Sequence, residues 1–355
     1  MRVITALRKR LGRPDKPYRY PLERSNDRVY QEGWSGRIYI WDIDKTYLAT
    51  EIHSLRALLA VPFEFAIDKR NVAGTVALLR ALRRGIAPRG LTAANPIYFV
   101  SASPRELRTV IQRKMLLDGV EFDGITFKDQ VALVTRGQFG KMREQIGYKL
   151  SALMLNRREL PWDVEETLFG DDSESDALIY SLYGDIVAGR LRDEQLVRTL
   201  LKHQVRREDA EFVALQASDL PHRETVHSIY INLEVRRNPE RFSEFGPRLV
   251  PCHDTFQAAL RLFEDGQIGQ DGVAEVAEQL VVRHRRQLPS LLRSAADMVA
   301  RGAVGLDTLE RLWGALQMRG LAPDYFVVDP ARVPSHPRPE AARGGYFTPE
   351  SMRAD

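Results

Sequence analysis

Short apolar runs alternate with amphipathic stretches along the first half of the chain. Residues 37–41, 96–100 and 166–170 are dense in apolar and β-branched side chains, which is typical of buried strands. Residues 71–84 and 142–158 repeat apolar side chains at helical spacing, and Asn71 is expected to cap the first of these helices. Strands that alternate with helices predict an α/β fold, with an open, mostly parallel sheet and helices on both faces.

The second half of the chain reads as helical, with one further strand. Helix is expected over 177–213, a strand over 228–234 and a helix over 253–264. Two amphipathic helices follow in 271–320, with a turn at Gly302 and Gly305, and they could shield a site, dimerise or recruit a partner. The predicted organisation is a basic N-terminal arm (1–35), an α/β domain (36–267), a helical region (268–325) and a Pro- and Gly-rich flexible tail (326–355).

Composition narrows the functional classes. The content of 44% apolar and 28% charged residues fits a globular protein, no run of 18 apolar residues is present, and the lone Cys252 excludes an internal disulfide. These features favour a cytoplasmic protein. The net charge of +4 is too small to indicate nucleic-acid binding by itself.

Positive charge is concentrated at the N-terminus, where residues 1–37 hold ten Lys or Arg against four acids. With Tyr18, Tyr20 and Tyr30 interleaved, this arm is suited to peripheral contact with an anionic surface, either a membrane or a nucleic acid. The alternative is a solvated leader that packs over the domain.

The first predicted strand runs directly into Asp42-Ile-Asp-Lys-Thr46. This spacing puts two carboxylates at the carboxyl edge of the sheet, where ligands bind in such folds. Asp42 is placed to attack a phosphoryl group, and Asp44 to protonate the leaving oxygen and later activate water. Thr46 is expected to fix the turn through local hydrogen bonds.

Two carboxylates would repel a phosphate dianion, so the site calls for added positive charge. Mg²⁺ bound by carboxylate oxygens is the usual solution. Asp171, which follows the third strand, is the predicted metal ligand alongside Asp42. Asp176 is expected to lie behind the metal ligands and to orient the cation or a lysine. Asp172 could serve either as a metal ligand or in this supporting role.

Two further side chains complete the predicted site. Ser101 closes the second strand and offers a hydroxyl to a phosphoryl oxygen, while Lys149 offers an ammonium. Lys128 and Lys141 lie in the same interval and are alternatives to Lys149. Ser103, just before a proline, is expected to cap a helix.

In order and context, these residues resemble the four motifs of the haloacid dehalogenase superfamily. Ile43–Thr46, Val100–Pro104 and Phe169–Tyr180 are similar to the catalytic domain of phosphatidate phosphatases of the actin-patch-protein type. The resemblance covers about residues 36–186. It implies strand order 5-4-1-2-3, hydrolysis of a phosphomonoester such as phosphatidate, and Mg²⁺ held by Asp42, the main-chain carbonyl of Asp44, and Asp171.

The motifs also depart from that family. Lys45 replaces an acid, Asp172 and Glu174 replace Ser and Gly, and Ala177 replaces Pro. The catalytic groups are retained, but these departures weaken the prediction that the substrate is a lipid. Phosphorylated nucleic-acid ends or phosphoproteins are alternative substrates, and a binding scaffold that has lost activity is the alternative from another class. The intervals between the motifs are too short for a large cap domain, which favours an open site.

Overall fold

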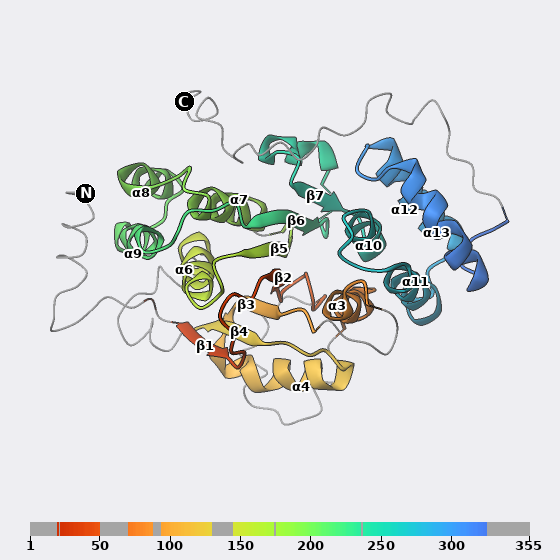
Figure 1. The fold of residues 1–355 in the computed structure, drawn as a ribbon, viewed down its shortest axis with the longest axis horizontal. Coiled ribbons are helices and arrows are strands. Elements are labelled where there is room, and N and C mark those ends of the chain that lie inside the picture. The colour runs from red at the N-terminus through yellow and green to blue at the C-terminus, as the bar shows by residue number, and fades with distance from the viewer. Residues whose placement is uncertain are drawn as a thin grey trace.

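A computed structural model describes Tyr20 and residues 22–49, 70–87, 94–129, 145–173, 175–235 and 237–324. Its centre is a seven-stranded sheet with helices on both faces (Figure 1). The strands in chain order are β1 (Leu22–Asn26), β2 (Gly36–Asp42), β3 (Ile97–Pro104), β4 (Gly124–Lys128), β5 (Val164–Asp171), β6 (Val226–Asn232) and β7 (Leu249–Cys252).

The strands lie in the order β1-β4-β3-β2-β5-β6-β7, with β1 antiparallel to β4 and every other neighbouring pair parallel. The predicted α/β class with a mostly parallel sheet is therefore confirmed. The predicted order 5-4-1-2-3 is wrong for this sheet, which has additional strands at both edges. Strands β1, β4 and β7 were missed, because each has only four or five residues, and charged side chains in β1 and a proline in β7 further hide the strand pattern.

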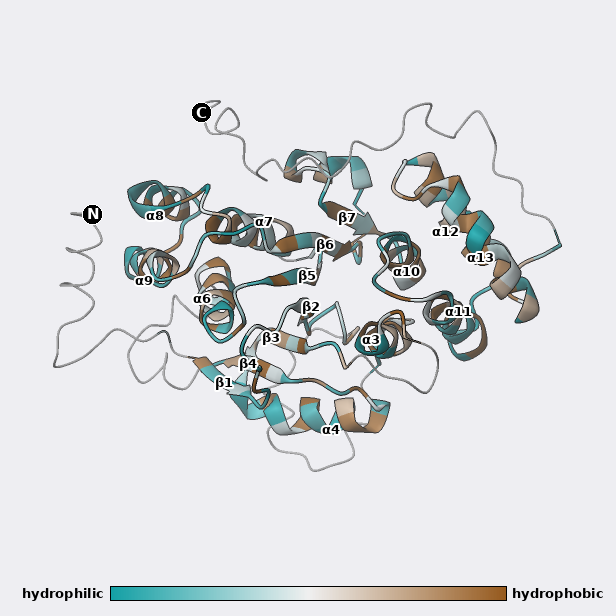
Figure 2. Ribbon diagram, viewed as in Figure 1, coloured by the Kyte–Doolittle hydropathy of each residue, from teal (hydrophilic) through white to brown (hydrophobic). Residues whose placement is uncertain are grey.

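Helices cover both faces of the sheet. One face carries α3 (Thr75–Arg84), α4 (Arg108–Asp118), α10 (Thr255–Glu264), α11 (Gln270–Glu278), α12 (Leu288–Ala300) and α13 (Leu306–Met318). The other carries α6 (Ile146–Arg157), α7 (Asp176–Val187), α8 (Asp193–Lys202) and α9 (Arg207–Ser218). Figure 2 shows hydrophobic and hydrophilic residues mixed along these helices, as expected of helices that bury one side.

The helices after residue 270 share the core of the sheet rather than a core of their own. Their apolar side chains belong to the same buried cluster as Trp41 and Phe169. Two polar contacts also hold these helices against the rest of the domain. The side-chain amide of Gln257 donates to the Ser294 main-chain carbonyl at 3.0 Å, and Gln279 Oε1 accepts from the Ala77 main-chain amide of α3 at 3.1 Å. The turn expected at Gly302 and Gly305 does separate α12 from α13.

The region expected to be a basic arm contributes to the sheet from residue 22 onward. Tyr20 is buried, and β1 pairs along the whole of β4. Arg24 forms an ion pair with Glu159, and Arg28 one with Asp123, so both arginines have acidic partners within the domain. Residues 1–19 and the predicted tail at 326–355 lie outside the described residues.

The start of α3 differs from the sequence prediction. Helix α3 begins at Thr75 after Gly74, whose φ of 86° is left-handed, and its Ala77 amide is capped by the distant Gln279. Asn71 does not cap this helix; its side chain bonds Asp118 and Lys114 instead. A Cβ at position 74 would lie 2.1 Å from Thr255 Oγ1, so this close approach of α3 to α10 requires glycine.

None of the helices in the described part of the chain is both long and apolar enough to cross a membrane.

Candidate active site

The topology brings the predicted site residues together at one edge of the sheet. Asp42 is the last residue of β2, Asp171 the last of β5, and Ser101 lies near the end of β3. These three strands are parallel neighbours at the centre of the sheet, so their carboxyl ends meet. Lys149 reaches this edge from α6, and Asp176 is the first residue of α7.

Lys149 forms ion pairs with two of the aspartates at this edge of the sheet. Its Nζ lies 3.0 Å from Asp42 Oδ1 and 2.5 Å from Asp176 Oδ1. All three side chains are at most 1% exposed, so these charges interact in a medium much less polarisable than water. The predicted lysine therefore contacts the predicted nucleophile. Lys128 lies over the Tyr148 ring, 5.4 Å from its centroid, and Lys141 lies outside the described residues.

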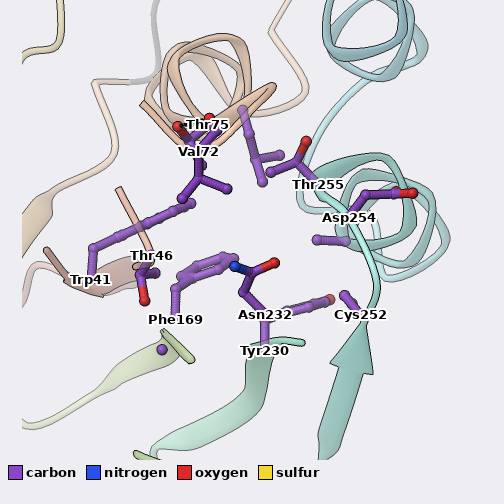
Figure 3. A pocket seen from close by; sticks show the side chains of 13 residues that line it. Trp41, Thr46, Val72, Thr75, Phe169, Tyr230, Asn232, Cys252, Asp254 and Thr255 are labelled. Atoms are coloured by element: carbon purple, nitrogen blue, oxygen red, sulfur yellow. Dashed lines mark hydrogen bonds between the residues drawn. The ribbon is translucent and has the colours of Figure 1, made fainter. Parts of the chain in front are cut away.

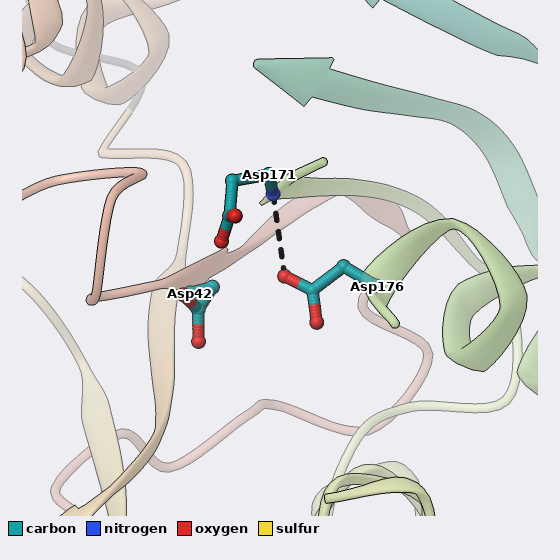
Figure 4. A group of neighbouring side chains, drawn as sticks. All are labelled: Asp42, Asp171 and Asp176. Atoms are coloured by element: carbon teal, nitrogen blue, oxygen red, sulfur yellow. Dashed lines mark hydrogen bonds between the residues drawn. The ribbon is translucent and has the colours of Figure 1, made fainter. Parts of the chain in front are cut away.

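Three buried carboxylates converge beside this lysine (Figure 4). Asp42, Asp171 and Asp176, here called the acidic cluster, each offer one oxygen, and these oxygens lie within 4.8 Å of one another. Two of these carboxylates, those of Asp42 and Asp176, contact the buried Lys149 ammonium, and the carboxylate of Asp171 lies beside them. Such an excess of negative charge is costly to bury, and a cation bound by oxygen ligands offsets it. The acidic cluster could hold a metal ion.

Within the cluster, Asp176 is oriented by the protein itself. One of its oxygens contacts Lys149, and the other accepts the Asp171 main-chain amide at 3.3 Å. Both Asp176 oxygens therefore have partners within the protein, an arrangement that fits a carboxylate that supports neighbouring ligands. Gly170 makes the approach possible, because a Cβ there would lie 2.4 Å from Asp176 Oδ2.

Asp44 is held by two serines of β3. Ser103 Oγ donates to Asp44 Oδ2 at 2.7 Å, and Ser101 Oγ donates to the same oxygen at 3.3 Å. The expected helix cap at Ser103 is wrong: the 3-10 helix that follows begins at Arg105, and its cap position is Pro104 with no side-chain hydrogen bond. Sequence reasoning missed this contact because a serine before a proline is a common capping pattern.

The turn after Asp42 is fixed by main-chain bonds rather than by Thr46. The amides of Tyr47 and Leu48 donate to the Ile43 carbonyl at 3.0 and 2.9 Å, and Lys45 has a left-handed φ of 57°. Thr46 Oγ1 is buried and has no hydrogen-bond partner among the described residues, contrary to the sequence prediction.

Asn232 is a site residue that the sequence reasoning missed. It ends β6 beside Asp171, and its Nδ2 donates to the Lys45 carbonyl at 3.0 Å. The side chain thus ties the turn that carries Asp44 to the neighbouring strand. A polar residue at the end of a predicted strand was the signal that could have identified it.

A small cavity adjoins this turn on the face of the sheet covered by α3 and α10. Figure 3 shows Thr46 and Asn232 at its border, with Trp41, Phe169 and Tyr230 along one side. The rings of Trp41 and Phe169 are stacked with 4.1 Å between their centroids, and those of Phe169 and Tyr230 with 5.0 Å between theirs. Cys252 also lines the cavity, where burial raises the pKa of its thiol to about 12 and keeps it protonated and unreactive at neutral pH.

Asp172 points away from the acidic cluster. Its Oδ1 accepts the Val235 amide at 2.9 Å and its Oδ2 the Arg237 amide at 3.4 Å. Asp172 therefore anchors the loop after β6, and these contacts differ from both roles left open for it, metal ligand and supporting acid.

No family model, no curated protein and no solved structure matches this chain. Its function is therefore argued from the geometry of the site.

We expect a divalent cation to stabilise the folded protein. Binding to the acidic cluster relieves repulsion that only the folded state has, so Mg²⁺ at about 100 times its Kd should raise the free energy of unfolding by about 2.7 kcal/mol. Thermal melting in EDTA and in Mg²⁺, Mn²⁺ or Ca²⁺ measures this. Asp171→Asn should weaken the response, whereas equal melting in EDTA and in all three cations would contradict a metal site.

Proposed function

We propose that this chain is a Mg²⁺-dependent phosphomonoester hydrolase of the haloacid dehalogenase type, acting through an aspartyl-phosphate on Asp42. The observation that carries the proposal is the contact of Lys149 with Asp42 and Asp176, beside Asp171, at the carboxyl edge of the central strands. The inner strands add support: counted without β1 and β7, the succession β6-β5-β2-β3-β4 corresponds to 5-4-1-2-3.

The donor set supports Mg²⁺ as the metal. The acidic cluster offers oxygen ligands alone, which suit hard cations. We assign Asp42, Asp171 and the main-chain carbonyl of Asp44 as ligands, with Asp176 and Lys149 supporting them. When bound, Mg²⁺ would supply positive charge that lets a phosphate dianion approach the carboxylates.

The protein's own groups then divide the chemistry. An Asp42 oxygen forms a bond to phosphorus while the bond to the leaving oxygen breaks, and Asp44 transfers its proton to that oxygen. In the second step Asp44 takes a proton from water as the water oxygen attacks phosphorus, which releases phosphate and restores the Asp42 carboxylate. Lys149 offsets charge on Asp42 throughout, and the Ser101 hydroxyl, which donates to Asp44 at 3.3 Å without substrate, would turn to donate to a phosphoryl oxygen when substrate binds.

The proposed substrate order begins with phosphatidate or a related lipid phosphate. The resemblance to phosphatidate phosphatases favours it, and a basic N-terminal segment suits an anionic membrane surface. Phosphorylated nucleic-acid ends and phosphoproteins come next, followed by small metabolites. Because Arg24 and Arg28 are paired within the domain, membrane contact would depend on the basic residues that precede them.

Phosphate release from a panel of substrates tests the function. The panel contains phosphatidate vesicles, 5′- and 3′-phosphorylated oligonucleotides, phosphopeptides and sugar phosphates, each in Mg²⁺ and in EDTA. We expect Mg²⁺-dependent release, fastest on vesicles, together with an acid-stable, hydroxylamine-labile phosphoryl group on the chain. Faster release from oligonucleotides or phosphopeptides would replace the lipid assignment. Silence from a folded, metal-binding protein would instead favour a scaffold without catalytic activity.

A further inference from the structure

We propose that Ser103 is a positioning residue that holds Asp44 in the orientation needed to protonate the leaving group. This inference rests on the proposed function and assigns a role to a side chain outside the catalytic set described above. It is drawn from the contacts among Asp44, Ser101 and Ser103.

Of the two serines, Ser103 makes the stronger contact with Asp44. Its Oγ lies 2.7 Å from Asp44 Oδ2, a usual length for a hydroxyl donating to an oxygen, whereas Ser101 Oγ lies at 3.3 Å. Asp44 is half-buried, lies outside the strands and makes an isolated bridge with Leu48, so its side chain depends on the serine hydroxyls for hydrogen bonds at Oδ2. A short bond to one carboxylate oxygen also sets the direction of the other.

Ser103 controls Ser101 as well. The Ser103 main-chain amide donates to Ser101 Oγ at 3.1 Å, which orients the hydroxyl of Ser101 so that its own hydrogen points toward Asp44. Both serines are buried, at 0% and 5% exposure, so water competes little for these bonds. The Ser103 side chain thus donates to Asp44 directly, while its main-chain amide, which Ser103→Ala retains, orients the second donor.

The backbone of β3 explains why the Ser103 side chain can reach Asp44. The pairing of β3 with β4 shifts register between Ser101 and Pro104, and such irregularities re-aim side chains beside functional sites. Proline at 104 restricts the preceding residue to an extended conformation, which keeps Ser103 in the strand. Its side chain therefore points to the same side as that of Ser101, toward a residue 59 positions earlier in the chain.

Leaving-group dependence distinguishes positioning from a structural role. A p-nitrophenolate leaves without help from an acid, whereas an alkoxide such as that of glycerol requires a proton. We expect Ser103→Ala to lower kcat/KM for glycerol phosphate or phosphatidate by roughly ten- to hundredfold, and for p-nitrophenyl phosphate by less than about threefold. Ser103→Thr retains the hydroxyl and should restore most of the difference.

Ser228→Ala removes a buried hydroxyl from β6 and is the matched control, expected to leave both substrates unaffected. Thermal melting confirms that each variant is folded. Equal loss on both substrate types, or no loss on either, would overturn the role of Ser103 while leaving the proposed function intact. If Ser103→Ala does not fold, Ser103→Thr and Ser103→Cys are compared on the two substrate types instead. A Ser103→Cys variant with the same leaving-group dependence as the wild type would then overturn the role of Ser103. A wild type inactive on all substrates would overturn both.

Discussion

Asp42→Asn should abolish phosphate release while making the metal-free protein more stable. The amide cannot attack phosphorus, so we expect turnover to fall by about four orders of magnitude or more. The same change removes one of the buried charges that crowd around Lys149, and Lys149 keeps its contact with Asp176. In EDTA the free energy of unfolding should therefore rise by roughly 0.5–2 kcal/mol.

Steady-state assays and denaturant unfolding with and without Mg²⁺ measure the two effects. Asp163→Asn is the matched control, because this exposed aspartate lies just before β5, at the end opposite Asp171, and pairs with Arg223. It should change neither activity nor stability by much. Retained activity in Asp42→Asn would show that another group is the nucleophile, and a large loss of stability would show that Asp42 is needed for folding.

Lys149→Met should produce the largest loss of stability at the site. Methionine has a similar length but no charge, so Asp42 and Asp176 would remain buried without the ammonium that contacts both. Removing one partner of a buried pair typically costs about 3–5 kcal/mol, and we expect that range here in EDTA. Mg²⁺ should narrow the deficit, because its charge serves the same carboxylates, and activity should be lost in all conditions.

A double variant separates the charge effect from lost packing. Lys149→Met with Asp176→Asn removes one of the orphaned carboxylates and should recover more than about 1 kcal/mol relative to the sum of the single changes. Lys114→Met is the control, since Lys114 forms a buried pair with Asp118 on α4, with 2.5 Å between Nζ and Oδ1. It should lose stability but keep its activity per folded molecule. Additive effects at Lys149 and Asp176 would contradict a shared charge cluster.

Local patterns were enough to find the strands that carry the site. The apolar run before Asp42 and the glycine before Asp171 each marked a strand end, and parallel strands place such ends together. The strands at the sheet edges gave no comparable signal, because β7 has four residues and includes a proline. The sequence therefore predicted β2, β3, β5 and β6 but missed the short strands β1, β4 and β7.

Three side chains in and near the site do not make the local hydrogen bonds that the sequence predicted. Ser103 was expected to cap a helix and bonds Asp44 instead, while Asn71 was expected to cap α3 and bonds Asp118. Thr46 was expected to bond within its own turn, and main-chain groups hold that turn. For Ser103 and Asn71 a tertiary contact replaces a local hydrogen-bonding preference, whereas at Thr46 local main-chain bonds replace the expected side-chain bond.

The sequence by itself determined that carboxylates, a hydroxyl and a lysine would gather at the carboxyl edge of an α/β sheet, because strand periodicity and motif spacing are local properties. The tertiary structure decided which of the candidate lysines contacts Asp42, that Asp172 anchors a loop and Asp176 contacts that lysine, and that Ser103 and Asn232 hold the turn. Those outcomes depend on how α6, β3 and β6 approach β2 in space. Side-chain contacts between elements far apart in the chain depend on how those elements pack, so local sequence patterns do not predict them.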